Sequence, residues 1–150
     1  MNIKGKKSVD SIHKELGHIM WEYVGMGRTA EGLKEGLKKL KEVRKEFEKE
    51  LFIPGDKEGM NVELDKAIRL YDFITMGELV AYDALNRNES CGGHFREEYQ
   101  TEEGEAKRDD ENYFYVACWE YQGSDDKAPV LYKEPLVYEA IKVQTRNYKS

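Results

Sequence analysis

Apolar residues recur at steps of three and four in three stretches of the first 87 residues. Residues so spaced share one face of an α-helix, so the pattern predicts three amphipathic helices. The side chains expected to face inward are Val9, Ile12, Leu16, Ile19, Met20 and Tyr23 in the first helix, Leu33, Leu37, Leu40, Val43, Phe47 and Leu51 in the second, and Leu64, Ile68, Tyr71, Ile74, Leu79 and Leu85 in the third.

Local signals indicate where these helices begin and end. The glycines after Val24 end the first helix, and Thr29 is a suitable N-cap for the second. Pro54-Gly55 is expected to stop the second helix, because proline cannot continue it. Asn61 can cap the third, and Gly92-Gly93 closes the helical half of the chain.

A strand pattern follows the helices. Residues 113–121 are rich in β-forming types, and turn residues at 123–126 precede a short apolar segment at 130–132, which predicts a β-hairpin. We therefore expect a mainly α-helical protein with a single domain over residues 1–150: an antiparallel three-helix bundle (8–87), a charged loop (88–112), and a β-hairpin with an extended C-terminal tail (113–148).

The charge balance excludes nucleic acid as a partner. The chain has 30 acidic and 24 basic residues, a formal charge of −6, whereas nucleic-acid binding needs clustered, uncompensated Lys and Arg. Residues 97–111 carry eight acids against two bases, so we expect a solvated loop there or one neutralised by a partner. No apolar run reaches about 18 residues, and residues 1–7 lack the flank of a secretory signal, so we expect a cytoplasmic chain without direct membrane insertion.

Few residues suggest catalysis or metal binding. Cys91 and Cys118 share no CxxC spacing, and the three histidines are too scattered for a zinc site. Cys91 as nucleophile and His94 as general base form a possible pair, but no acidic residue is placed to orient the histidine. Residues 25–30 meet a loose dinucleotide fingerprint, yet they follow a helix and not a strand. We expect no catalytic, cofactor-binding or metal-binding residue in this chain.

Charged side chains of the loop are candidates for structural or interface contacts instead. Arg96 and Arg108 lie among acids that include Asp109 and Asp110, where guanidinium groups can brace carboxylates or backbone carbonyls. For His94, hydrogen bonds that fix the loop are the alternative to a catalytic role.

The predicted strand supplies the remaining candidates. Tyr113, Tyr115, Trp119 and Tyr121 occupy odd positions and share one face. This aromatic face packs either on the chain's own helices or on a larger body, because aromatic residues dominate the energetics of interfaces.

Two motifs resemble those of a known family. Residues 88–99, NESCGGHFREEY, resemble the ESRGAHxRxD(Y) signature of succinate dehydrogenase and fumarate reductase flavoprotein subunits, and residues 108–113, RDDENY, are similar to the RDDENW-type segment that follows it. Residues 20–28 resemble the opening of that family's C-terminal domain, and 133–136 and 146–148 resemble its close in bacterial members. Cys91 replaces the usual arginine, so a salt bridge made by that arginine is not expected, and Glu97 or Glu98 replaces the usual aspartate.

The resemblance implies a non-catalytic scaffold and docking domain of a flavoprotein that interconverts succinate and fumarate. FAD would be held by the parent subunit and not by this chain. The implied partners are the FAD-binding and capping domains of the same subunit and an iron-sulfur subunit, in a complex at the inner face of the membrane. The alternatives are a free-standing helical adaptor and the C-terminal domain of an L-aspartate oxidase-like flavoprotein; the RDDEN segment favours the succinate/fumarate branch.

Overall fold

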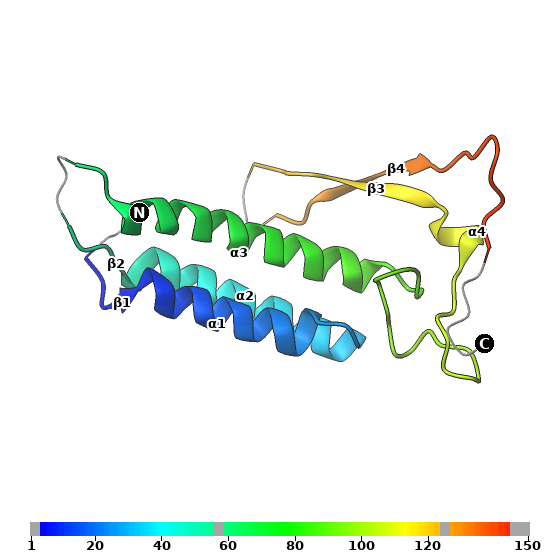
Figure 1. Cartoon of the computed structure of the whole chain (residues 1–150), viewed down its shortest axis with the longest axis horizontal. Helices are drawn as coiled ribbons and strands as arrows, with labels where there is room; N and C mark the ends of the chain where they lie inside the picture. Colours follow the sequence, from blue (N-terminus) through cyan, green and yellow to red (C-terminus); the bar gives the residue numbers. More distant parts are fainter. Residues whose placement is uncertain (1–3, 56–58, 124–126, 145–150) are drawn as a thin grey trace.

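Three long helices lie side by side in the computed structural model, which describes residues 4–55, 59–123 and 127–144 (Figure 1). They are α1 (Val9–Val24), α2 (Ala30–Glu50) and α3 (Val62–Asn86). A short helix, α4 (Asp110–Tyr113), precedes the antiparallel strands β3 (Tyr115–Glu120) and β4 (Val130–Pro135). The predicted fold class, a helical bundle followed by a β-hairpin, is confirmed. The hairpin turn at 124–126 and the end of the tail at 145–148 lie outside the described residues.

Each long helix begins at a side-chain cap. The caps are Ser8, Thr29 and Asn61, and the side-chain oxygen of each accepts a hydrogen bond from the backbone N–H three residues further on. These bonds satisfy donors that have no partner within the helix. Thr29 and Asn61 are the caps that the sequence predicts.

The second helix is shorter than predicted. It ends at Glu50, and Leu51–Phe52 form a short strand, β2, that pairs in parallel with β1 (Lys7–Ser8). In this extended backbone the side chains alternate, so Leu51 is buried and Phe52 is exposed. Leu51 thus continues the apolar stripe without being helical. Because β1 precedes α1 and β2 follows α2, this pairing also fixes the two helices as antiparallel neighbours.

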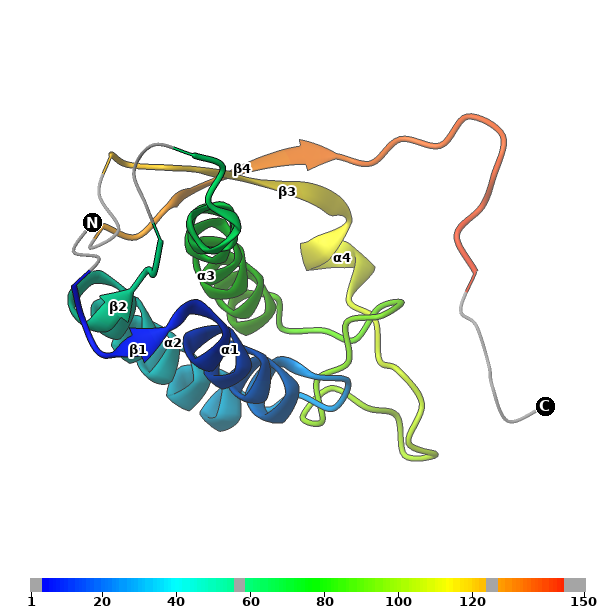
Figure 2. The ribbon, with the colours of Figure 1, turned by 60° about the vertical axis from the view of Figure 1, so that its left-hand side comes forward.

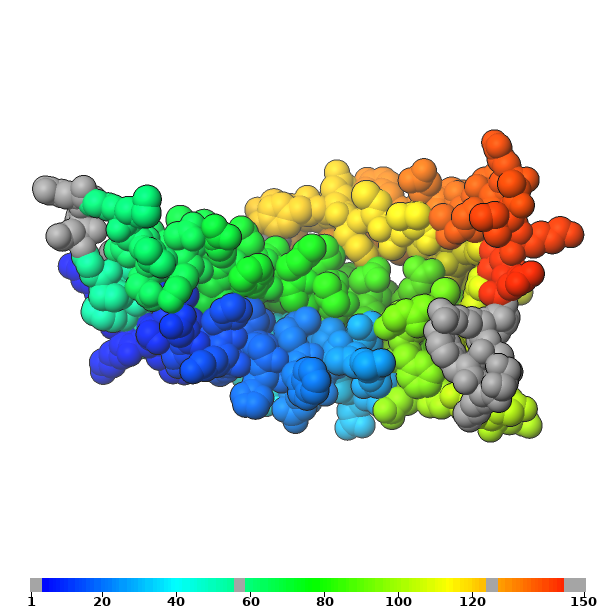
Figure 3. Space-filling model, viewed as in Figure 1, coloured from blue at the N-terminus to red at the C-terminus, as the bar shows by residue number. Residues whose placement is uncertain are grey.

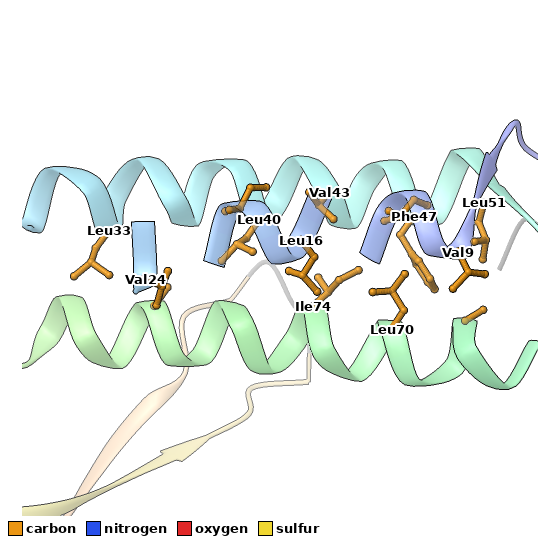
Figure 4. Packing of buried hydrophobic residues seen from close by; sticks show 14 of the residues in the cluster. Val9, Leu16, Val24, Leu33, Leu40, Val43, Phe47, Leu51, Leu70 and Ile74 are labelled. Atoms are coloured by element: carbon orange, nitrogen blue, oxygen red, sulfur yellow. The ribbon is translucent and has the colours of Figure 1, made fainter. Parts of the chain in front are cut away.

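The core lies between the three helices (Figure 4). Large side chains from α1 and α2 meet α3, and Met20, Tyr23, Leu37 and Leu85 pack around the buried cluster. The buried apolar residues are Val9, Ile12, Leu16, Ile19, Val24, Leu33, Leu40, Val43, Phe47, Leu51, Ile53, Ala67, Leu70, Ile74, Ala81 and Ala84.

The predicted inner face of α3 is wrong in its first half. Leu64, Ile68 and Tyr71 are 41%, 55% and 39% exposed, whereas Ile74 is fully buried. The buried side of α3 is next to the predicted one, and most of its residues are small. They are Ala67, Leu70, Ile74, Gly77, Ala81 and Ala84. Small residues let α3 approach α1 and α2 closely. The prediction from the sequence was misled because it gave large apolar side chains more weight than small ones. Apolar residues therefore surround α3 on several sides.

The hairpin forms a second layer along α3 (Figure 2; Figure 3). Its register places Trp119 opposite Leu131, and the odd-numbered residues of β3 are half-buried while the even ones are exposed. Trp119 donates from Nε1 to Asp83 Oδ1 at 2.7 Å and meets the Tyr82 ring edge-on at a centroid distance of 5.1 Å. This side of the strand therefore packs on the chain's own third helix.

Candidate functional site

The loop between α3 and α4 crosses one end of the bundle and carries a buried arginine. Arg96 is 2% exposed, and its guanidinium Nη1 donates to Ala84 O at 2.9 Å and Leu85 O at 3.3 Å, both in the last turn of α3. Arginine binds these carbonyls favourably because they have no helical partner and carry the negative end of the helix dipole. Arg96 thus closes the C-terminus of α3.

Glu98 continues the same chain of contacts to α2. Arg96 Nε donates to Glu98 Oε2 at 3.1 Å, and Glu98 Oε1 accepts from the backbone N–H of Ala30 at the start of α2. Partial burial opposes ionisation, but the hydrogen bonds from Ala30 and Arg96 outweigh it and lower the pKa of Glu98. We call Arg96 and Glu98 the clasp, because the pair joins the negative end of α3 to the positive end of α2.

Backbone bonds hold the clasp against the α1–α2 connection. Arg28 N donates to Phe95 O at 3.2 Å, and Glu97 N donates to Arg28 O at 2.8 Å. Ser90 Oγ accepts from Arg96 N at 2.8 Å from inside the loop. The loop is therefore built into the end of the bundle, and its solvated acids are those on its outer side.

His94 stands beside the clasp as a neutral ring. Arg28 Nη1 donates to His94 Nδ1 over 3.0 Å, and His94 Nε2 donates to Arg87 O over 2.9 Å. Burial lowers the pKa of His94, and the positive charges of Arg28, Arg96 and Arg87 lower it further against the raising effect of the Arg87 carbonyl. Protonation would place a proton on the nitrogen that accepts from Arg28.

This arrangement predicts a pH dependence of stability. The pKa of His94 in the folded protein lies below 6.5, the ordinary value for histidine. The stability that the neutral ring contributes is therefore fully present above about pH 6.5 and is lost as the pH falls through the folded pKa. His94→Gln should flatten this part of the profile, since an amide does not titrate. The measurement is urea unfolding between about pH 7.5 and 5, with His18→Gln on the exposed side of α1 as the control. An unchanged pH slope in His94→Gln would contradict the neutral ring.

Glu89 organises the other side of the loop. Its side chain is 2% exposed and accepts from Arg87 Nε at 2.8 Å and from the backbone N–H of Asp109 at 2.9 Å. Asp109 in turn accepts from Asn112 N–H and caps α4. Arg87 Nη2 also donates to Tyr113 O at 2.6 Å. The end of α3 and the start of α4 are thus tied together through one buried carboxylate.

Arg108 joins a separate group of contacts. Its Nε donates to Asp110 Oδ1 at 3.0 Å, and Nη1 donates to Gln144 O in the tail at 3.3 Å. The residues singled out from the sequence fall in several places. His94 and Arg96 lie at the end of the bundle. Asp109 and Tyr113 lie around Glu89, and Trp119 packs on α3. Sequence reasoning missed Arg28, Arg87 and Glu89 as contributors. Arg28 and Glu89 carried a signal as members of the motifs at 20–28 and 88–99, and Arg87 carried none.

Cys91 and His94 lie at the two ends of a tight turn. The two residues exchange backbone hydrogen bonds of 2.8 and 3.1 Å across a turn, in which Gly92 adopts a positive φ of 58°. Both ring nitrogens of His94 are occupied by Arg28 and Arg87. Within residues 4–55, 59–123 and 127–144, no three His, Cys, Asp or Glu side chains gather as metal ligands. None of the helices in those ranges is both long and apolar enough to cross a membrane.

A surface groove runs between α1 and α3. It has a volume of about 300 Å³, and its walls include Met20, Phe73, Met76 and Val80. Phe73 is 49% exposed and Met76 is 58% exposed, and the exposed Val116 on β3 lines a neighbouring hollow together with Met76 and Val80. We call Met20, Phe73, Met76, Val80 and Val116 the apolar flank. A patch of this kind on the surface of a domain is typical of a site that another protein surface covers.

Comparison with known proteins places the chain. A family described as "Fumarate reductase flavoprotein C-term" matches residues 13–148. The fumarate reductase flavoprotein subunit of Proteus vulgaris is 34% identical over 113 residues, which cover 75% of this chain and 18% of that protein. A chloroplastic L-aspartate oxidase of Oryza sativa subsp. japonica is 40% identical over 86 residues, 57% of this chain and 13% of that protein.

Solved structures of fumarate reductase resemble this fold. A structure of quinol-fumarate reductase with menaquinol molecules superposes with a TM-score of 0.76 at 26% identity, covering 95% of this chain and 23% of the matched one. The chain spans less than a fifth of the length of the curated relatives it matches, 18% in the Proteus protein. With the family matched over residues 13–148, the chain belongs to the C-terminal domains of succinate dehydrogenase and fumarate reductase flavoprotein subunits.

Proposed function

We propose that this chain is a non-catalytic scaffold and docking domain of a flavoprotein subunit that interconverts succinate and fumarate. FAD is held by the FAD-binding and capping domains of that subunit, an iron-sulfur subunit is the further partner, and the complex lies at the inner face of the cytoplasmic membrane. The apolar flank carries this proposal. A helix that is apolar on several sides is normally buried. Among the described residues, α1, α2 and the hairpin cover parts of α3, while Phe73 and Met76 stay exposed.

The clasp and its neighbours serve this role by holding the surface rigid. We propose that His94, Arg96, Arg108, Asp109, Asp110, Tyr113 and Trp119 brace the loop and hairpin. Trp119 fixes β3 on α3 through Asp83 and so positions Val116 on the outer side of the strand. A rigid surface binds with a smaller loss of conformational entropy than a flexible one. The likeness to the rice L-aspartate oxidase supports a second candidate, the corresponding domain of an L-aspartate oxidase-type flavoprotein.

The test is reassociation of residues 1–150 with the separately expressed flavin-binding part of the same subunit. Met76→Glu with Val80→Glu should weaken association at least about tenfold, because two carboxylates would be desolvated at the interface. Ser11→Glu with His18→Glu adds the same charge at exposed positions of α1 and should leave affinity within about twofold. Affinity is measured by isothermal titration calorimetry, and flavin absorbance should stay with the flavin-binding part.

Two results would count against the proposal. Equal affinities of the two double variants would show that the apolar flank is not the docking surface. Stoichiometric flavin retained by residues 1–150 alone would contradict a non-catalytic scaffold. Urea unfolding of both variants should give the same stability within about 1 kcal/mol, since all four positions are exposed or at the surface.

A further inference from the structure

One face of α2 carries four exposed lysines on a chain that is acidic as a whole. Lys34, Lys38, Lys41 and Lys45 follow at steps of four, three and four, so they share one side of the helix. Within the part of the chain that the structure describes, Lys38 alone of these has an ion-pair partner, Glu35 at 3.7 Å, and both side chains are exposed. We call these four residues the lysine stripe. Glu42 lines the same surface, which therefore has four lysines against one acid on a protein whose net charge is −6.

An apolar hollow adjoins the stripe. It has a volume of about 310 Å³ and lies between α2, α3 and the hairpin residues Trp119, Tyr121 and 127–129. Leu37 and Lys41 line both this hollow and the shallow depression along the stripe, so the two surfaces are continuous. We call the hollow the aromatic hollow; besides Leu37 and Lys41, its walls include Leu79, Tyr82, Trp119, Tyr121, Lys127 and Pro129.

The walls of the aromatic hollow are already held in place. Trp119 is fixed by its 2.7 Å hydrogen bond to Asp83 and by its edge-on contact with Tyr82. Thr75, Glu78, Leu79 and Tyr82 of α3 line the hollow, and in Figure 2 this helix lies between the α1–α2 layer and the hairpin. A preformed apolar hollow of this size is at the small end of ligand pockets and suits one inserted side chain better than a whole cofactor.

We propose that the lysine stripe and the aromatic hollow together bind an acidic protein segment that carries one large apolar side chain. The stripe spans eleven helical steps, about 16 Å, which matches about five residues of extended chain. Carboxylates of such a segment pair with the lysines and set its orientation, while its apolar side chain enters the hollow and supplies most of the affinity. This surface lies on the α2 side, apart from the apolar flank, and does not depend on the docking role proposed above.

A lipid surface fits these features less well. The stripe alone would attract an anionic membrane, but the hollow is recessed beside the hairpin and needs a projecting side chain to fill it. A protein segment provides both the charge and the projection. A protein segment and a membrane can therefore be distinguished, because only the protein segment needs an apolar side chain to bind.

The experiment uses residues 1–150 and a fluorescein-labelled peptide with one phenylalanine between two runs of four acidic residues. Binding followed by fluorescence anisotropy should saturate at low salt and weaken as salt rises. Lys38→Glu with Lys45→Glu should weaken binding about tenfold or more, and Lys14→Glu with Lys107→Glu, exposed lysines elsewhere, should change it less than twofold. A peptide with serine in place of phenylalanine should bind about tenfold more weakly.

A second readout locates the anchor. In a Trp21→Phe background, Trp119 is the remaining tryptophan, and its emission should shift when the phenylalanine peptide binds but not with the serine peptide. The proposal is overturned if no binding occurs, if both lysine pairs matter equally, or if serine replaces phenylalanine without loss. Binding to vesicles containing phosphatidylserine without binding to the peptide would overturn it in favour of a membrane. Lys34→Gln with Lys45→Gln repeats the test with a milder change if the charge reversal unfolds the chain.

Discussion

Arg96→Met is expected to lower the free energy of unfolding by about 3 kcal/mol. The substitution keeps an unbranched apolar chain in place of the aliphatic part of arginine but removes the guanidinium and all its donors. Two carbonyls in the last turn of α3 then lose their partner, and the Glu98 carboxylate loses the cation beside it. Glu98 is 40% exposed and is partly compensated by water, so we expect a value at the lower end of the range for broken buried ion pairs.

Urea unfolding followed by circular dichroism measures this effect. Arg69→Met is the matched control, because Arg69 also pairs with a carboxylate, Asp65 at 3.0 Å, but both side chains are more than 60% exposed. We expect the control to change stability by less than about 0.5 kcal/mol. A loss of similar size in both variants would show that the clasp contributes no more than a surface ion pair.

Phe47→Ala is expected to lower the free energy of unfolding by about 4 kcal/mol. Phe47 is 1% exposed in the last turn of α2 and packs beside Tyr71 at a ring-centroid distance of 6.1 Å. Removing the ring leaves a cavity that two flanking helices cannot close without losing their other contacts. The loss combines the transfer free energy of the ring with the cost of the cavity.

Phe73→Ala provides the control for this prediction and a link to docking. Phe73 is 49% exposed and stacks on His13 at 5.5 Å, so its removal should cost about 1 kcal/mol or less in residues 1–150 alone. It belongs to the apolar flank, and the same substitution should weaken reassociation with the flavin-binding part. Equal losses of stability for the two phenylalanines would contradict the difference in burial between Phe47 and Phe73.

The loop of residues 88–112 shows how a charged segment becomes part of a fold. Composition predicts a solvated or partner-neutralised loop, and most of its acids are indeed exposed. Its inner side, however, contains a buried carboxylate in Glu89 and a buried guanidinium in Arg96, each fully engaged with backbone groups at helix ends. Helix ends supply unpaired donors and acceptors, so a charged loop can be buried there without leaving charges uncompensated.

The sequence predicts features of this protein that depend on neighbours along the chain. Spacing, capping residues and alternation depend on contacts within a few positions, which is why the three helices, the caps Thr29 and Asn61, and the hairpin could be predicted. The motif around His94 and Arg96 could also be recognised in the sequence, and it indicated the family that the comparison shows. Arg96 among acids indicated a brace, since an arginine beside carboxylates has partners within reach.

The tertiary structure decided what depends on distant segments. It chose the small-residue side of α3 for the core, paired Leu51 with the chain before α1, and gave Arg96 its partners in α3 while Glu98 reached α2. It also placed Arg28 against His94 across 66 positions of sequence. Periodicity says which residues share a face, but which of two apolar faces is covered depends on the shape of the neighbouring helices, and a local pattern does not contain that shape.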